Sequence, residues 1–378
     1  MADATSRKLL QLLTADHDGE LRRAAAMVLA EVGTKDAQLA QALCAAVDDP
    51  DPPFRARVLR AIGKLRVARA LPRLLALVAE GGPDTAAAAA AAACLGNPGT
   101  KALRDMMAEA SPVLRRRIAA ALGAGGTASA ETAAVDALLD EDPGVVDAAT
   151  RSLIAQVAAV GSEHRRALAD HVLALLKAKR RLRPASEAAL LRLLAALGDS
   201  RGEAAFWARV DAKNPPELRA AALQALGSLP VPSARDRVQR LLDCAASPEF
   251  RVAAPALMIL RTVPVGERLW QDWLPLLDAP DPAARRFAID KLQGRDTQAF
   301  ASALVRQLKQ PDRSLREQAL ACLSVLEQGR KALVGELLEV ESAEEAWVLA
   351  RAQAPFAPNY AASLRSEIFA RACRYLEA

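Results

Sequence analysis

Aromatic residues are scarce in this sequence of 378 residues: seven Phe, four Trp and two Tyr make up 3% of it. The sequence also lacks the runs of Val and Ile that the strands of a large β-sandwich, a Rossmann sheet or a TIM barrel need. Alanine supplies much of the apolar fraction of 52%, leucine comes next, and both residues favour helices. The composition therefore excludes most enzyme folds built on large sheets and predicts an all-α fold.

Cysteine is also scarce, and no two of the five cysteines form a CxxC motif. Widely spaced cysteines in an odd number predict reduced, mostly buried thiols of a cytoplasmic protein rather than a disulfide framework. The first residues lack the apolar core of a signal peptide, and the longest conspicuous uncharged run, residues 85–100, is too short to span a bilayer. We therefore expect a cytoplasmic location and no membrane insertion. The cysteines are Cys44, Cys94, Cys244, Cys322 and Cys373.

No motif of a known catalytic or cofactor site is present. The sequence has neither a GxxxxGK[ST] nor a GxGxxG phosphate loop, and it has no GxSxG nucleophile motif. Its three histidines are too few for a metal site, which needs several converging ligands. We expect His164 and His171, seven residues apart on one helix face, to be solvated. We therefore predict no enzymatic activity, no catalytic residue, no cofactor and no metal.

A short phrase recurs along the chain, in which an arginine is followed by helix-forming apolar residues. Clear copies are residues 216–227, 281–292 and 312–323. The distance between the arginines of consecutive copies is 33 residues from position 22 to 55, 32 from 219 to 251, 34 from 251 to 285 and 31 from 285 to 316. Such a period is typical of repeat proteins. The arginines that mark the copies are Arg22, Arg55, Arg115, Arg219, Arg251, Arg285 and Arg316.

Degenerate copies fill the gaps, so we expect one solenoid over residues 1–378. In each unit, a first helix with apolar residues at i, i+3, i+4 and i+7 precedes a turn with Asp and Pro. A second helix then begins with Pro and in several units ends in Leu-Gly, as helix termini favour. The eleven units are residues 4–33, 35–63, 66–96, 98–124, 128–159, 162–198, 200–228, 231–262, 265–294, 296–327 and 329–353, and a capping helix follows at 359–377.

This pattern resembles HEAT repeats, and within them the bacterial type called PBS-lyase HEAT-like, over essentially the whole chain. The resemblance implies an α-α superhelix, a HEAT-repeat solenoid of helical hairpins, with the first helices on the convex side and the second helices on the concave side. One hairpin cannot bury its apolar face alone, so neighbouring units stack into a continuous core. The resemblance identifies a fold and no reaction.

A solenoid without catalytic motifs predicts a non-catalytic scaffold or adaptor that binds a partner protein on its concave face, such as a subunit of a larger assembly. The alternative is nucleic-acid binding through a basic groove, as in the HEAT-like DNA glycosylases. The 50 Lys and Arg against 45 Asp and Glu leave a net charge of +5, which is less than a dedicated nucleic-acid binder usually carries. A chromophore lyase or chaperone, suggested only by the family's name, is the least favoured function.

The repeated arginine has two interpretations. A charge repeated at the structural period usually serves the structure, so we favour an arginine ladder that pairs with turn aspartates such as Asp51, Asp281 and Asp312. In the other interpretation the arginines form a basic stripe for an acidic partner, to which the dense cluster at residues 177–183 would belong. The candidate partner-binding residues are Arg55, Arg57, Arg115, Arg116, Lys177, Lys179, Arg180, Arg181, Arg183 and Trp207.

The four tryptophans differ in their positions within the repeat. Trp270 and Trp273 align with core leucines of an earlier first helix, so we expect both to be buried. Trp207 follows a core-like phenylalanine and is the aromatic residue that we expect to be partly exposed. Trp347 stands where Arg316 stands one unit earlier, and we expect it to close the last repeat against the terminal helix.

Overall fold

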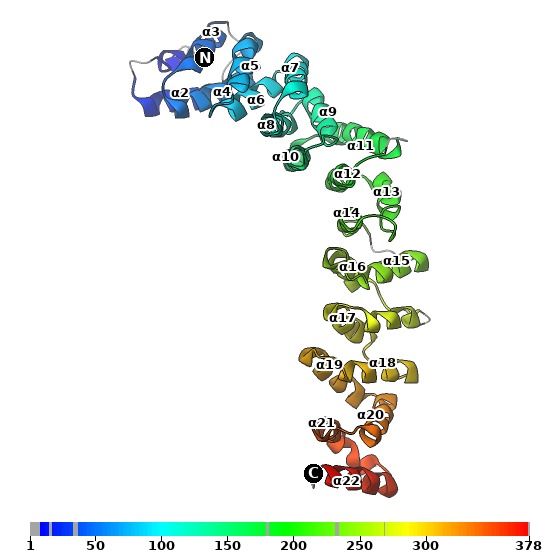
Figure 1. Cartoon of the computed structure of the whole chain (residues 1–378). Coiled ribbons are helices and arrows are strands. Elements are labelled where there is room, and N and C mark those ends of the chain that lie inside the picture. Colours follow the sequence, from blue (N-terminus) through cyan, green and yellow to red (C-terminus); the bar gives the residue numbers. More distant parts are fainter. Residues whose placement is uncertain are drawn as a thin grey trace. The chain divides into compact units, whose positions relative to one another are not determined.

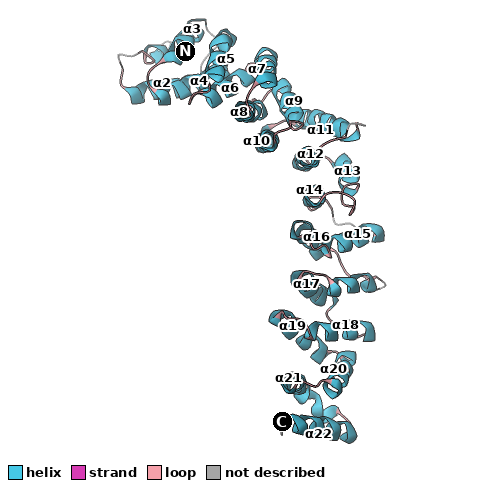
Figure 2. Cartoon of the chain, viewed as in Figure 1, coloured by secondary structure: helices cyan, strands magenta, loops and turns pink. Residues whose placement is uncertain are grey.

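The computed structural model describes residues 8–14, 17–32, 37–178, 181–230, 234–267 and 269–376. These residues form helices joined by turns, and no strand occurs among them, which confirms the predicted all-α fold of helical hairpins (Figure 2). Within these ranges no helix combines the length and the apolar character needed to cross a bilayer. The contacts between helices divide the chain into unit 1, residues 1–209 and 224–228, and unit 2, residues 210–223 and 229–378.

Unit 1 is a stack of hairpins in which first and second helices alternate along the chain (Figure 1). Each second helix packs against the next one, from α2 to α12. The second helices are α2 (Gly19–Val32), α4 (Pro52–Leu65), α6 (Thr85–Cys94), α8 (Pro112–Gly123), α10 (Pro143–Gln156) and α12 (Pro184–Leu197). The first helices are α3 (Ala37–Ala45), α5 (Leu71–Glu80), α7 (Asn97–Glu109), α9 (Ala128–Ala137), α11 (Ser162–Lys177) and α13 (Glu203–Trp207), with 3-10 turns η1 (Ala46–Asp48), η2 (Ala68–Ala70), η3 (Val157–Ala159) and η4 (Ser200–Gly202).

Unit 2 shows the same alternation. After its last hairpin and the 3-10 turn η6 (Ala354–Asn359), α22 (Ala362–Leu376) packs against α20 and α21, where the sequence predicts the capping helix. The second helices are α14 (Pro216–Leu226), whose last residues belong to unit 1, α16 (Phe250–Thr262), α17 (Pro282–Leu292), α19 (Arg313–Val325) and α21 (Ala343–Gln353). The first helices are α15 (Arg235–Ala245), the 3-10 helix η5 (Trp270–Asp278), α18 (Gln298–Leu308) and α20 (Glu327–Glu339).

Helices of unit 1 approach one another closely because alanine lines their contacts. A Cβ atom placed on Gly63 of α4 would lie only 3.0 Å from the Cα atom of Ala91 on α6, so these two helices touch almost backbone to backbone. A bulky aromatic side chain has no room in such a contact, because protein interiors are close-packed. α6 packs between α4 and α8 and buries Ala88, Ala89, Ala91, Ala92 and Ala93.

Side chains in the turns cap the second helices as predicted. Ser111, Asp142 and Asp312 accept hydrogen bonds from backbone N–H groups in the first turns of α8, α10 and α19. The expected left-handed glycine occurs at Gly198, whose φ is 70° at the end of α12. Gly123 instead lies in the last turn of α8, where a Cβ atom would be 2.0 Å from the Oγ atom of Ser152. That glycine therefore serves close packing.

The first helix of the ninth hairpin departs from the α-helical pattern. Residues Trp270–Asp278 form a 3-10 helix that contains Pro275, which cannot donate a backbone hydrogen bond. Trp273 is 1% exposed, which confirms its predicted place in the core. Trp270 is only half-buried, so its predicted burial is wrong. The tighter winding of a 3-10 helix changes which side chains face the core.

Candidate interaction surface

The marker arginines sit at a defined place on the second helices. Counted from the N-cap residue, Arg55, Arg115 and Arg316 all occupy the fourth position. That position lies beside the turn of the same hairpin, where the first helix leaves carbonyl groups without partners. Arg115 donates a hydrogen bond to the Ala110 carbonyl at 3.2 Å, and Arg316 donates to the Gln310 carbonyl at 2.7 Å.

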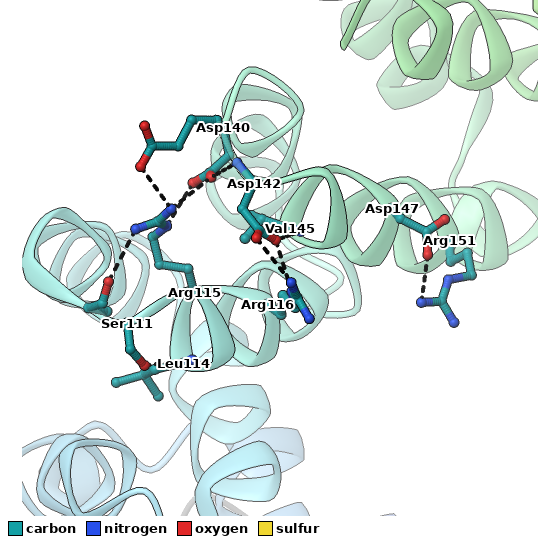
Figure 3. Close-up of polar contacts among 11 residues, drawn as sticks. Ser111, Leu114, Arg115, Arg116, Asp140, Asp142, Val145, Asp147 and Arg151 are labelled. Carbon is teal, nitrogen blue, oxygen red and sulfur yellow. Dashed lines mark hydrogen bonds and ion pairs between the residues drawn. The ribbon is translucent and has the colours of Figure 1, made fainter. Parts of the chain in front are cut away.

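The same side chains reach the turn of the following hairpin. Arg55 donates from Nη1 to the carbonyl oxygen of Asp49 at 2.7 Å in its own turn, and from Nε to Asp84 at 2.8 Å in the next turn. Arg115 Nε lies 3.0 Å from the carboxylate of Asp140 in the next turn (Figure 3). These contacts form a ladder of the predicted kind, but the arginines pair with Asp49, Asp84 and Asp140 and not with the expected Asp51, Asp281 and Asp312. Arg22 forms the same kind of contact with Asp49. The ladder arginines of unit 1 are therefore Arg22, Arg55 and Arg115.

The residue after the ladder arginine forms a second ion pair, with the N-cap aspartate of the next second helix. Arg116 donates to both carboxylate oxygens of Asp142, at 2.9 and 3.0 Å, and these bonds lower the pKa of Asp142 to about 2 (Figure 3). Asp281 caps α17 but forms no ion pair in the described part of the chain, so its predicted ladder role is wrong. The equivalent pairs are Arg23–Asp51 at 3.2 Å and Arg286–Asp312 at 3.3 Å.

Two hairpins use different chemistry at the ladder position. Glu187 occupies the fourth position of α12 and pairs with Arg209 of the next hairpin at 2.8 Å, so the two charges are exchanged. In unit 2, Arg219 donates to the Val210 carbonyl at 3.1 Å and contacts the Cys244 thiol at 3.4 Å. Burial raises the pKa of Cys244, which keeps this thiol protonated and unsuited to nucleophilic chemistry.

Arg251 does not occupy the ladder position that its sequence spacing indicates. The N-cap of α16 is Glu249, so Arg251 is at the second position and exposed, while the buried Ala253 is at the fourth. The preceding Phe250 is 71% exposed, whereas Phe54, in the matching phrase of α4, is fully buried. The helix start, and not the residue count between phrases, decides which side chains face the core.

The prediction for Trp347 is wrong for the same reason. Ser342 caps α21, which puts Ala346 at the fourth position and Trp347 at the fifth. Ala346 is buried, while 59% of Trp347 is exposed, with the Arg351 guanidinium 5.2 Å from the centre of its ring. Trp347 therefore faces solvent and does not close the last repeat.

The predicted partner-binding residues of α4 and α8 fall into two kinds. Arg55 and Arg115 are held in the ladder by the contacts described above. Arg57 is exposed and forms no ion pair in the ranges that the structure describes. Arg116 is paired with Asp142, yet about half of its side chain is exposed. Of the predicted residues on these two helices, only Arg57 and Arg116 therefore remain accessible.

The remaining predicted residues lie near α11 and α13. Trp207 is only 7% exposed, and its Nε1 donates to Glu203 at 3.2 Å, so its expected exposure is wrong. The short α13 buries Phe206 and Trp207 together, which leaves no ring for docking. Lys177, Arg181 and Arg183 are exposed at the end of α11 and before α12, and Lys179 and Arg180 lie outside the described residues.

Large apolar side chains are exposed almost entirely on the second helices. Among the described residues, eleven of the twelve exposed large hydrophobic side chains lie there, and the twelfth is Phe369 on α22. We call the exposed side of the second helices the second-helix face. The arginine phrase did not reveal these side chains, because it does not fix where a helix starts: Phe250 follows the N-cap of α16 directly, and Trp347 is at the fifth position of α21. The eleven side chains are Leu21, Met27, Val28 and Val32 on α2, Val113 on α8, Ile154 on α10, Phe250 and Met258 on α16, Val325 on α19, and Trp347 and Val348 on α21.

Exposed charge on the second-helix face of unit 1 is mainly positive. Three of its cations are paired with acids: Lys64 with Glu31, Arg151 with Asp147 at 2.8 Å, and Arg116 with Asp142 at 2.9 Å. The exposed acids on these helices are Glu20, Glu31 and Asp147. The exposed cations are Arg57, Arg60, Lys64, Arg116, Arg117, Arg151 and Arg192.

The two histidines of α11 are half-buried and paired with acids of α9, which corrects the expectation that they are solvated. His164 Nε2 lies 2.9 Å from Glu131 Oε2, and His171 Nε2 lies 3.4 Å from Asp136 Oδ1. The Glu131 side chain is 2% exposed, and this burial raises the pKa of its carboxyl group. No group of three or more His, Cys, Asp or Glu that could hold a metal occurs in the described ranges.

Glu131 is expected to make the stability of unit 1 depend on pH. A carboxyl group whose pKa is raised by folding keeps its proton in the folded chain where the unfolded chain has lost it, so its contribution to stability falls as the pH rises through that window. The window begins near the ordinary pKa of 4.5. As the pH is lowered from 7 towards 4.5, we expect the wild type to gain stability relative to Glu131→Gln, measured by urea denaturation.

The same comparison in a His164→Gln background removes the contact between the imidazole and Glu131 from the difference. A free-energy difference between the glutamate and glutamine variants that stays constant over this pH range would contradict the prediction.

Residues 6–94 of the chain match the model of a family described as HEAT repeats. The structure of Kap121p bound to Pho4p is similar, with 13% identity, a TM-score of 0.48, and coverage of 99% of this chain and 46% of that chain. A structure of Kap95p with RanGDP has 14% identity, a TM-score of 0.46, and coverage of 98% and 60%. The chain thus spans less than two thirds of either protein. No curated protein matches the sequence.

Proposed function

We propose that this chain is a non-catalytic scaffold or adaptor that binds a partner protein on its second-helix face. One observation carries the proposal: the exposed large apolar side chains gather on the second helices, and no described first helix from α3 to α20 exposes one. Single exposed apolar residues are normal on a protein surface, but their restriction to one of two helix layers indicates a docking surface. Covering them with a partner would contribute about 25 cal/mol for each Å² of apolar area removed from water.

The ladder supports a protein partner over a nucleic acid. The ladder arginines, such as Arg55 and Arg115, carry the most regular positive charge of the repeat. They are already paired with carboxylates and carbonyl groups of the turns. The cations that remain exposed, such as Arg57, share the second-helix face with apolar Met27 and Val113. A mixed apolar and polar surface is typical of protein interfaces, whereas a nucleic-acid site requires clustered cations. The free, widely spaced cysteines suit a cytoplasmic complex of this kind.

The proposal predicts that partner binding is lost when the second-helix face is made polar. We expect the combined variant Met27→Ser, Val113→Ser, Phe250→Ser and Trp347→Ser, which changes four second helices at exposed positions, to fold and to lose its partner. Phe369→Ser is the matched control, because Phe369 is 71% exposed like Phe250 but lies on α22. Affinity purification from the native cells with quantitative mass spectrometry compares the wild type and both variants.

A protein captured equally by the wild type, the four-site variant and the control variant would overturn the proposal. Recovery of a nucleic acid in place of a protein, with strong salt dependence of binding, would favour the alternative function.

A further inference from the structure

A hollow of about 610 Å³ lies on the second-helix face of unit 2, over α17. It is bordered by Arg261 of α16 on one side and by Gln318 of α19 on the other. These are the second helices that precede and follow α17 in the stack (Figure 1). Its walls combine an aromatic ring with charged and amide groups, which suits a side chain of mixed character. The residues that define it are Arg261 of α16, Arg286, Phe287, Asp290 and Lys291 of α17, and Gln318 of α19.

An apolar stripe runs along α16 to this hollow. Phe250, Ala254 and Met258 follow one another at intervals of four residues, so they share one side of the helix, and Arg261 follows one turn later. Phe250 and Met258 are each 71% exposed, more than any other large apolar side chain of the second helices that the structure describes. The stripe covers about 12 Å along the axis, at 1.5 Å for each residue.

Two of the cations around the hollow are already occupied. Arg286 pairs with Asp312 at 3.3 Å. Lys291 donates from Nζ to the backbone carbonyls of Arg261 and Val263, at 2.6 and 3.0 Å. Neither cation is therefore free to hold a ligand without losing these contacts.

The free positive charges lie at the two ends of the stripe. Arg251 and Arg261 are exposed, and neither guanidinium has a hydrogen bond or ion pair in the part of the chain that the structure describes. The acids of this region are Glu249 at the N-cap of α16 and Asp290, which lines the hollow and accepts a hydrogen bond from Gln318. The stripe is thus an apolar strip between two unpaired arginines, and its charge complement is an acidic partner.

We infer that α16, with the hollow over α17, is the docking site for an acidic segment of a partner protein that carries large apolar side chains. The inference rests on the proposed function and narrows it to one helix and one kind of segment. The apolar side chains of the segment cover Phe250 and Met258 and enter the hollow beside Phe287, and its carboxylates pair with Arg251 and Arg261.

A nucleic acid fits this site less well. Binding to a phosphate backbone depends on several cations that are free to neutralise charge, and this site offers two. The 71% exposed Met258 between them has no counterpart in a phosphate backbone. An apolar side chain flanked by carboxylates covers Met258 and pairs with both Arg251 and Arg261.

Selection of short peptides tests the inference. A library of random peptides displayed on phage is panned against the full chain, and the dissociation constant of each enriched peptide is measured by fluorescence polarisation. We expect enriched peptides to combine Asp or Glu with Phe, Leu, Trp or Met. Met258→Asp and Arg261→Glu are each expected to weaken binding by about tenfold or more, as changes to central interface residues do.

Charge exchange gives the sharpest control. Replacing the acidic residues of the enriched peptide with lysine should restore binding to Arg261→Glu, because the positions of the charges are then reversed. Phe369→Ser on α22 should leave the affinity unchanged. Circular dichroism verifies that each variant, changed at an exposed position, is folded.

The outcomes separate this inference from the proposed function. Peptides that bind with equal affinity to Met258→Asp and Arg261→Glu but are lost with Val113→Ser or Trp347→Ser would overturn the inference and leave the proposed function standing. Enriched peptides that are basic would overturn it as well. Peptides insensitive to every second-helix variant would overturn both. Duplex DNA bound by the wild type and lost in Arg261→Glu would replace the protein partner with a nucleic acid.

Discussion

Replacing Gly99 with alanine is expected to unfold the contact between α6 and α7. Gly99 is the third residue of α7, and a Cβ atom at this position would lie 1.9 Å from the carbonyl oxygen of Ala92 and 2.8 Å from its carbonyl carbon. Because those atoms belong to the backbone of α6, they cannot turn aside as a flexible side chain does. We expect Gly99→Ala to lower the free energy of unfolding by about 3 kcal/mol or more, the upper range for overpacking a core.

Gly335→Ala is the matched control for Gly99→Ala. Gly335 lies in α20, and a Cβ atom there would meet nothing within 4 Å. In an exposed helix, alanine is favoured over glycine by about 0.5–1 kcal/mol, so the same substitution is expected to stabilise the chain. Urea denaturation measures both variants, and hydrogen exchange of the α6 and α7 amides reports the local loss. Equal unfolding midpoints for the wild type and Gly99→Ala would contradict the close approach of the two helices.

Removing a ladder arginine is expected to destabilise unit 1 more than removing an exposed arginine of the same helix. Arg55 is 17% exposed and Asp84 is 15% exposed, and Arg55→Ala leaves the Asp84 carboxylate and the Asp49 carbonyl without this partner. A buried polar group that loses its partner keeps its desolvation cost. We expect a loss of about 2–3 kcal/mol in the free energy of unfolding, between the values for exposed and fully buried ion pairs.

Arg57→Ala separates the ladder from a general effect of charge. Arg57 lies two residues away on α4, is exposed, and has no ion pair within the described ranges, so its loss is expected to change stability by about 0.5 kcal/mol or less. A double-mutant cycle between Arg55→Ala and Asp84→Ala measures the direct coupling of the pair. A loss for Arg55→Ala no larger than that for Arg57→Ala would show that the ladder does not stabilise the stack.

Most of the helices could be predicted from the sequence because their signals are local. A capping side chain, a proline in the first turn and an apolar period of 3.6 residues all lie within one helix and its turn. The helices α9 (Ala128–Ala137) and α10 (Pro143–Gln156), for example, both fall within the predicted unit 128–159. The ladder was predictable in kind, because its charge recurs with the structural period.

The exposed surface was predicted less well. When the arginine phrase is shifted by one or two residues relative to the start of its helix, its side chains face another side of the helix. Phe250 and Phe54 precede an arginine in the same local phrase, yet one is 71% exposed and the other is fully buried. Trp347 differs by one position from the ladder site and faces solvent, and Trp207 is buried in a helix of five residues. The spacing of residues alone does not show where each helix starts, and the start decides which of its side chains face the core.

The order of amino acids alone determined that this chain is helical, that it repeats, and where its turns lie, since propensity, capping and periodicity act over a few residues. Only the tertiary structure decided which charged side chains pair with a neighbouring hairpin and which remain unpaired. Glu131 meets His164 across 33 positions of sequence, and Arg55 meets Asp84 across 29. Such pairs depend on how one hairpin rests on the next, and they leave Arg251, Met258 and Arg261 of α16 open to a partner.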